Sequence, residues 1–142
     1  MNTYLHRVQY YETDMMGVVH HANYLRWMEE ARIDFMDQLG FPYRKMEAAG
    51  VFSPVKAISC DYRRTCTFGD EIAVAVSVES FNGVVLAITY RMCQTATGEE
   101  VCTARSEHVF LNREGRFVRL PRVMPDFCEA IRELVPPETP VD

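Results

Sequence analysis

Hydrophobic residues recur at helical spacing over residues 22–39, and this pattern predicts one long α-helix. The apolar positions form a broad face, which is typical of a helix that is buried on more than one side. They are Tyr24, Leu25, Trp27, Met28, Ala31, Phe35, Met36 and Leu39. We expect Trp27 and Met28 to lie in the core, and Gly40 with Pro42 predicts the end of the helix.

Extended segments are predicted on both sides of this helix. The clearest is residues 71–81, where Ile72, Val74, Val76 and Val78 alternate with small or polar residues, as in a strand with one buried face. Asn82-Gly83 then predicts a type I′ turn, in which both central residues need positive φ. Further strands are predicted over residues 3–11, 55–67, 84–95, 101–111 and 116–120, with turns at residues 96–99 and 112–115.

The order of these elements predicts an α+β fold. One long helix followed by antiparallel strands buries its apolar face most simply inside a curved antiparallel sheet that wraps around the helix. A short final helix is predicted over residues 125–134, because Pro125 can start it and apolar residues share one of its faces. We therefore expect a single domain over residues 1–135 and a disordered tail over residues 136–142, where prolines are frequent.

Composition and charge argue against several classes of protein. The chain has 142 residues, of which 48% are hydrophobic, and it can bury one ordinary core. It lacks a signal-peptide pattern and any apolar run near the roughly 20 residues of a membrane helix, so a cytoplasmic protein without membrane contact is expected. The five cysteines are dispersed and predict neither a disulfide framework nor a zinc site. A net charge of -5 without a basic tail argues against nucleic-acid binding.

A ligand that carries phosphate therefore needs a local cluster of basic residues. The pair Arg63-Arg64, near the end of segment 55–67, is the best candidate, although a solvated strand end is an equally good interpretation. Charged residues in the middle of the long helix are expected to form solvated or interface pairs of small energetic weight. They are Arg26, Glu29, Glu30 and Arg32.

Residues 7–24 carry the most specific pattern in the chain. Asp14 lies in the connection between the first predicted strand and the long helix, and an aspartate there is by itself most often a turn or cap residue. The unpaired N–H groups of the first helical turn, however, can bind a negatively charged oxygen. We assign this role to the backbone N–H of His21, with that of Ala22 as a second candidate. Gly17 permits a sharp turn and a close approach of substrate.

The same segment resembles the active-site signature of hotdog-fold acyl-CoA thioesterases, in the branch of the 4-hydroxybenzoyl-CoA thioesterases. Over residues 7–24 the match reads Arg-Val, four residues, Thr-Asp, two residues, Gly-Val-Val, one residue, His, two residues, Tyr. The resemblance implies a hotdog fold, Asp14 as nucleophile or general base, His21 beside the thioester and Tyr10 on the opposite strand. A core position is an equal alternative for Tyr10. Tyr24 is expected to form core or pocket wall.

The resemblance also implies a substrate and a mode of assembly. The segment is most similar to that of the short-chain acyl-CoA hydrolases, which favours a short- or medium-chain acyl-CoA over an aromatic one, with no cofactor and no metal. Gly17 and Tyr24 would then lie at the substrate, and Arg63 and Arg64 at the coenzyme A phosphates. A homodimer or homotetramer with sites at the subunit interface is expected. Two alternatives remain: a thioesterase acting on acyl carrier protein, and a non-catalytic acyl-thioester-binding protein.

Overall fold

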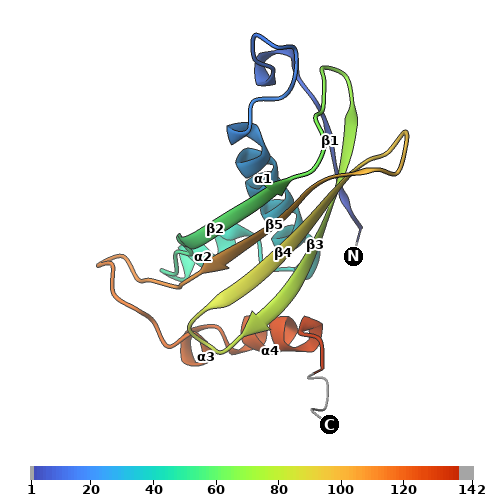
Figure 1. Ribbon diagram of the computed structural model, residues 1–142. Helices are drawn as coiled ribbons and strands as arrows, with labels where there is room; N and C mark the ends of the chain where they lie inside the picture. The colour runs from blue at the N-terminus through green and yellow to red at the C-terminus, as the bar shows by residue number, and fades with distance from the viewer. Residues whose placement is uncertain (1, 138–142) are drawn as a thin grey trace.

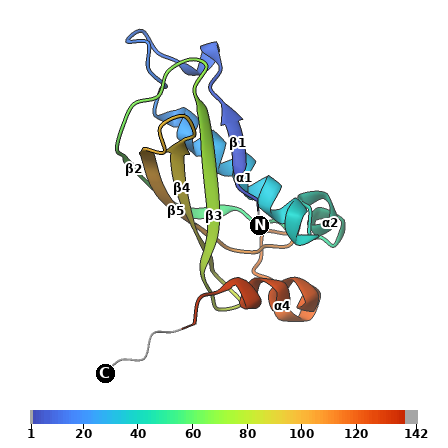
Figure 2. The same cartoon turned by 90° about the vertical axis from the view of Figure 1, so that its right-hand side faces the viewer.

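One long helix, α1 (Ala22–Leu39), lies along one face of a curved antiparallel sheet in the computed structural model, which describes residues 2–137 (Figures 1 and 2). The sheet has the strand order β1-β3-β4-β5-β2, and every neighbouring pair is antiparallel. Its strands are β1 (Tyr4–Arg7), β2 (Val55–Tyr62), β3 (Glu71–Phe81), β4 (Leu86–Gln94) and β5 (Glu100–His108). The predicted α+β class and the sheet around one long helix are confirmed.

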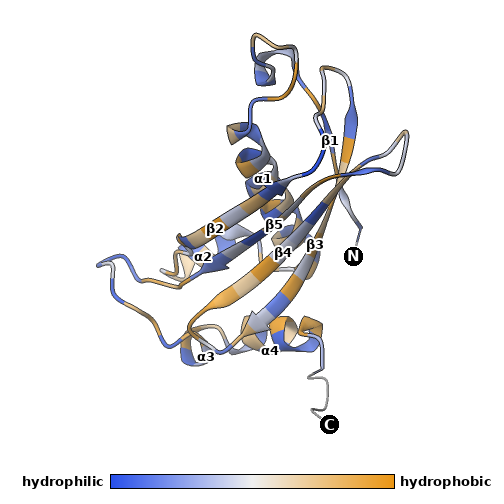
Figure 3. Ribbon diagram, in the orientation of Figure 1, coloured by the Kyte–Doolittle hydropathy of each residue, from blue (hydrophilic) through white to orange (hydrophobic). Residues whose placement is uncertain are grey.

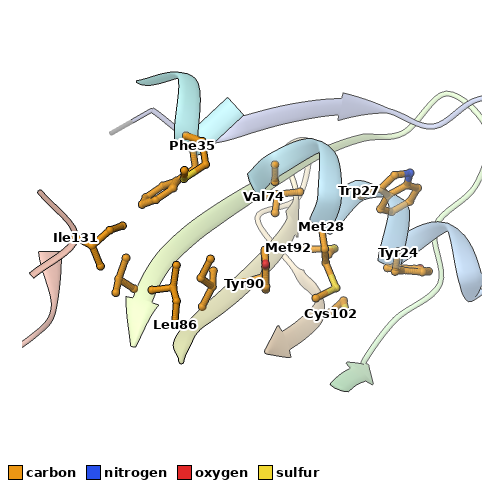
Figure 4. Close-up of a cluster of buried hydrophobic side chains, with 14 of the residues drawn as sticks. Tyr24, Trp27, Met28, Phe35, Val74, Leu86, Tyr90, Met92, Cys102 and Ile131 are labelled. Carbon is orange, nitrogen blue, oxygen red and sulfur yellow. The ribbon is translucent and has the colours of Figure 1, made fainter. Parts of the chain in front are cut away.

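The helix α1 has the bounds that the hydrophobic pattern predicted. It ends at Gly40, whose left-handed backbone (φ 93°) is the usual way to stop a helix. Trp27 and Met28 are fully buried, as expected. Figure 4 shows these side chains and Tyr24 in the cluster of buried side chains that lies between α1 and the sheet. The apolar face of α1 is thus the centre of the core.

The first strand is shorter than predicted. After Arg7 the chain leaves the sheet and forms a 3-10 turn, η1 (Tyr10–Glu12). The backbone N–H of Gln9 donates to the carboxylate of Glu12 over 2.8 Å, and this bond stabilises the turn in place of further strand pairing. The strand predicted over residues 3–11 is therefore too long at its C-terminal end.

The predicted type I′ turn at Asn82-Gly83 is wrong. Gly83 has φ 88°, but positive φ is confined to glycines among residues 2–137, so Asn82 does not have it. The Asn82 side-chain oxygen instead accepts hydrogen bonds from the N–H groups of Val84 and Val85, over 2.9 and 2.7 Å. The side chain thus organises a longer loop, and β4 begins only at Leu86.

The strand predicted over residues 116–120 is also wrong. Phe117 makes one isolated bridge to Leu111, and the chain then enters the short helix α3 (Leu120–Val123). Pro121 lies in α3 and has no N–H to donate to a sheet. The following helix, α4 (Pro125–Leu134), has the predicted bounds and lies near the ends of β3 and β4 (Figure 1).

Besides α3, the sequence pattern missed the helix α2 (Tyr43–Ala48), which follows the end of α1 (Figure 2). A six-residue helix is too short to show a periodic pattern, and only Met46 in it is buried. Residues 136 and 137 are exposed coil, and the rest of the predicted tail, residues 138–142, lies outside the described residues. None of the helices in the described part of the chain is long and apolar enough to span a membrane.

Candidate active site

Residues 13–19 form a small hairpin that projects beyond the start of α1 (Figure 1). Thr13 pairs with Val19, and the Asp14 N–H donates to the Val18 carbonyl over 2.8 Å. Gly17 closes the turn with φ 79°, and its N–H donates to the Asp14 carbonyl over 3.0 Å. A Cβ at Gly17 would meet no atom within 4 Å in the single chain, so it is the backbone angle that calls for glycine.

Asp14 is half-buried, and its carboxylate is only partly engaged. Oδ1 accepts a hydrogen bond from the Met16 N–H over 2.8 Å, which holds the side chain against the turn. Oδ2 accepts no hydrogen bond and joins no ion pair with the residues that the structure describes. One carboxylate oxygen is therefore available to a substrate or a water molecule.

The start of α1 leaves one backbone N–H free. The Ala22 N–H donates to His20 Nδ1 over 3.2 Å, and the Asn23 N–H donates to the His20 carbonyl over 3.0 Å. The His21 N–H has no acceptor within residues 2–137. Of the two N–H groups considered from sequence, the one of Ala22 is thus occupied and the one of His21 is available.

A pocket of about 230 Å³ brings four of the predicted site residues together beside this helix start. His21 and Tyr24 form one side of it, and Arg63 and Arg64, which follow β2, form the other. Val19, Tyr62 and Thr65 complete the lining. Asp14, Gly17 and Tyr10 do not line this pocket in the single chain.

Tyr62 is a pocket residue that sequence reasoning missed. Its hydroxyl donates to the His21 carbonyl over 3.0 Å, and its ring meets that of Tyr24 edge-on at 5.0 Å. The only signal in the sequence was its position directly before Arg63-Arg64 at the end of an extended segment. Tyr62 therefore holds the carbonyl of His21, the residue whose N–H is free.

Tyr24 is a wall of the pocket, as expected. It is 3% exposed, and its hydroxyl donates to Cys66 Sγ over 3.4 Å. Burial raises the pKa of the Tyr24 hydroxyl, with further contributions from Cys66. The phenol is therefore neutral at physiological pH and is not a base.

The two arginines have loose carboxylate partners on the neighbouring turn. Arg63 Nε lies 3.5 Å from Glu100 Oε1, and Arg64 Nε lies 3.5 Å from Glu99 Oε2. Their side chains are 54% and 61% exposed. Each guanidinium has five N–H donors in all, so both can also bind an anion at the pocket mouth.

An apolar rim surrounds the hairpin. Figure 3 shows hydrophobic stretches on this projecting loop. The side chains of the rim are strongly exposed and are Tyr10, Tyr11, Met15, Met16 and Phe68. Tyr10 is 75% exposed and meets only the edge of Phe68, so the alternative that placed it in the core is wrong. A rim of this kind marks a surface that binds an apolar ligand or another protein surface.

Glu12 anchors the hairpin to α1 and was not predicted. This carboxylate is 3% exposed and accepts hydrogen bonds from Gln9 N–H (2.8 Å), His6 Nε2 (2.8 Å) and Trp27 Nε1 (2.6 Å). Burial by itself would raise the pKa of Glu12, but these hydrogen bonds outweigh it and lower the pKa. The Glu12 carbonyl also accepts from Asn23 Nδ2 over 2.8 Å. One buried residue thus joins the hairpin to the helix.

No cluster of three or more His, Cys, Asp or Glu side chains is placed to hold a metal ion within residues 2–137. The chemistry that the site offers is that of a carboxylate with one free oxygen, an unpaired N–H at a helix start, and a pocket with two arginines at its mouth.

Comparison with known proteins identifies the family and the fold of this chain. The profile of the thioesterase-like superfamily matches residues 8–131. YneP of Bacillus subtilis, a candidate acyl-CoA thioesterase, is 37% identical over 124 residues, which cover 87% of this chain and 89% of that protein. YbgC of Escherichia coli, an acyl-CoA thioester hydrolase, is 30% identical over 96 residues, which cover 65% of this chain and 72% of that protein.

A solved structure extends the match to nearly the whole chain. The crystal structure of DHNA-CoA thioesterase from Staphylococcus aureus aligns with a TM-score of 0.89 and 31% identity, and the alignment covers 93% of this chain and 89% of that chain. The hotdog fold implied by the resemblance of residues 7–24 is thereby confirmed.

Proposed function

Because this chain belongs to the thioesterase-like superfamily and is a thioester hydrolase, we propose that it cleaves short- or medium-chain acyl-CoA to the free acid and coenzyme A with Asp14 as the reacting carboxylate. The observation that carries the proposal is the pair formed by the free Oδ2 of Asp14 and the free N–H of His21. The first can attack or activate water, and the second can stabilise the oxyanion.

The hairpin places both residues close to its paired positions. Thr13 pairs with Val19 across the hairpin. Asp14 directly follows Thr13, and His21 lies two residues after Val19. Glu12 connects the two arms of the hairpin at its base. Glu12 is the last residue of η1, and its carbonyl accepts a hydrogen bond from the His20 N–H over 2.9 Å. A thioester carbonyl held against the start of α1 would also lie at the positive end of the helix dipole. Its carbon would face the hairpin that carries Asp14.

Two routes use the same carboxylate. In the first, Asp14 attacks the carbonyl carbon, the C–S bond breaks as the oxyanion collapses, and water then hydrolyses the resulting mixed anhydride. In the second, Asp14 takes a proton from water as the water oxygen attacks, and the proton passes to the departing thiolate. Both routes require an ionised Asp14 and yield the carboxylic acid and the thiol of coenzyme A.

The pocket residues have separate roles in this proposal. Arg63 and Arg64 hold the phosphate groups of coenzyme A at the pocket mouth. Tyr24 forms an apolar wall, and Tyr62 keeps the His21 peptide in place. The motif favours a short or medium aliphatic acyl group. The likeness to DHNA-CoA thioesterase makes an aromatic acyl group the principal alternative.

A second copy of the chain would complete the site. β2 is one of the two outer strands of the sheet, and Val55, Ile58 and Tyr62 on it are 45%, 41% and 47% exposed. An apolar outer strand is a ready site for edge-to-edge pairing. A two-fold, antiparallel pair of β2 strands would bring the Val55 end of one copy beside the Tyr62 end of the other. Each pocket would then gain a wall from its neighbour, and sedimentation of the purified protein would show whether it is a homodimer or a homotetramer.

The test is hydrolysis of a panel of aliphatic and aromatic acyl-CoAs by the wild type and by Asp14→Asn. Asparagine keeps the oxygen that accepts from Met16 N–H, so the turn should be preserved. We expect kcat to fall by at least about 100-fold, the scale on which a principal acid–base or nucleophilic group acts. Asp37→Asn, an exposed position near the end of α1, is the matched control. Turnover like that of the wild type in Asp14→Asn would remove Asp14 from the mechanism.

A further inference from the structure

A second polar cluster lies in the core beneath the middle of α1. It begins with Arg32, which is 7% exposed and not in a solvated pair as the sequence had suggested. Arg32 Nη1 donates to the Tyr90 hydroxyl over 3.1 Å, Tyr90 bonds Ser106 Oγ over 2.7 Å, and Ser106 bonds His108 Nε2 over 2.7 Å. Figure 4 shows Tyr90 among the apolar side chains between α1 and the sheet.

This cluster holds a positive charge without a counter-charge. Arg32 joins none of the ion pairs found among residues 2–137, and its buried Nε has no hydrogen-bond acceptor there. Burial raises the pKa of the Tyr90 hydroxyl, and burial together with Arg32 lowers the pKa of His108 to about 4. Both groups are therefore neutral at pH 7, whereas an arginine keeps its charge. A buried charge without a partner is strongly unfavourable, so Arg32 is suited to receive an anion.

Arg32 also lines a cavity. The cavity is lined by Arg32, Tyr43, Ser53 and His108 together with apolar side chains, and at about 10 Å³ it holds one water molecule at most. It shares Tyr43, Met46 and Ser53 with a larger pocket of about 610 Å³ between α2 and the turn at residues 111–115. That volume is typical of a site for a small organic ligand. Met46, a flexible side chain, lines both spaces, and a carboxylate could reach Arg32 only if Met46 moved aside.

We propose that these two spaces form a binding site for an organic monocarboxylate with an apolar body. The carboxylate would bind the guanidinium of Arg32, whose planar fork matches a carboxylate with two parallel hydrogen bonds. The apolar body would lie in the larger pocket, whose walls include Val51, Phe52 and Leu111. Beside Arg32, Tyr90 and His108 are neutral, so its single positive charge can balance one carboxylate, whereas Glu47 and Arg113 line only the larger pocket.

Within the single chain, this site is separate from the thioester site. Arg32 follows His21 by eleven residues on α1, which is about 16 Å along the helix axis at 1.5 Å per residue. The fully buried side chains of Met28, Met92 and Cys102 lie in the core between the sheet and α1. The larger pocket and the pocket at His21 share no lining residue.

The test is calorimetric titration with octanoate at pH 7.5, with octan-1-ol as the neutral analogue of the same length. We expect one octanoate per chain and at least tenfold weaker binding of octanol. Arg32→Met keeps the size of the side chain and removes its charge, and it should weaken octanoate binding at least tenfold. Arg122→Met, at an exposed arginine of α3, is the matched control and should bind octanoate like the wild type.

Ser53→Phe provides a second test if Arg32→Met does not fold. Ser53 lines both spaces, so the larger side chain should block them while it leaves Arg32 in place. This variant should also abolish octanoate binding. Equal binding of octanoate and octanol by the wild type, no octanoate binding by it, or unchanged affinity in a folded Arg32→Met would overturn the proposal. The same holds if chloride alone competes fully with octanoate, because the site would then be one for inorganic anions.

Discussion

Acid should destabilise this protein in large part through one buried histidine, His108. The ring is 2% exposed, and burial, followed by the nearby charge of Arg32, lowers its pKa to about 4 from 6.5. The unfolded chain therefore binds a proton to His108 as the pH falls below about 6.5, while the folded protein resists protonation until about pH 4. Between pH 7.5 and 4.5 this difference lowers the free energy of unfolding by about 2 to 3 kcal/mol, at roughly 1.4 kcal/mol per pKa unit.

The measurement is urea unfolding of the wild type and of His108→Gln at a series of pH values from 7.5 to 4.5. Glutamine can still hydrogen-bond Ser106 but does not titrate in this range. The pH dependence of the variant should be weaker than that of the wild type by the same 2 to 3 kcal/mol. His20→Gln, which removes an exposed histidine, is the matched control. If wild type and His108→Gln lose stability in parallel between pH 6.5 and 4.5, the argument from the buried ring is refuted.

Two further predictions concern the anchor of the hairpin and the mouth of the pocket. Glu12→Gln should lower the free energy of unfolding by about 2 kcal/mol, because its amide group leaves a buried donor such as Trp27 Nε1 without an acceptor. Urea unfolding measures this loss, and Glu29→Gln, at an exposed position, is the control. Replacing both Arg63 and Arg64 by alanine should raise KM for acyl-CoA about tenfold with little change in kcat. Steady-state kinetics measure the effect. The KM for acyl-pantetheine, which lacks the nucleotide, should be unaffected. An unchanged KM for acyl-CoA would exclude the phosphate contact.

Local patterns determined how much of the fold could be predicted. The bounds of α1, β3 and α4 agree with the prediction because each has many side chains in a regular pattern on one face. Two of the failures occur where a single side chain overrides the pattern. Asn82 organises a loop with its side-chain oxygen, and Glu12 ends the first strand by bonding Gln9. Such choices depend on one hydrogen bond and leave no periodic signal.

Residues of the candidate pocket were predicted mainly from the motif at residues 7–24 and from one pair of basic residues. His21 and Tyr24 share a pocket with Arg63 and Arg64, although the arginines were chosen only as the best local pair of charges. Tyr62 was missed because it meets His21 across a separation of 41 residues. The contact from Arg32 to Tyr90, 58 residues away, was missed for the same reason. Contacts between distant segments become visible only in the folded chain.

The anchoring of the hairpin by Glu12 has a consequence for how this protein could acquire new substrates. The buried carboxylate and carbonyl of Glu12 tie the base of the hairpin to α1, whereas the exposed rim and the outer strand β2 lie outside this network. Substitutions on the rim, or on β2 at positions other than Tyr62, whose hydroxyl holds the His21 carbonyl, can therefore alter the fit of an acyl group without moving Asp14 relative to His21. If Asp14 and His21 react as proposed, the reacting groups and the surface around them can thus diverge independently, which would allow related chains to keep one reaction while their preferred acids differ.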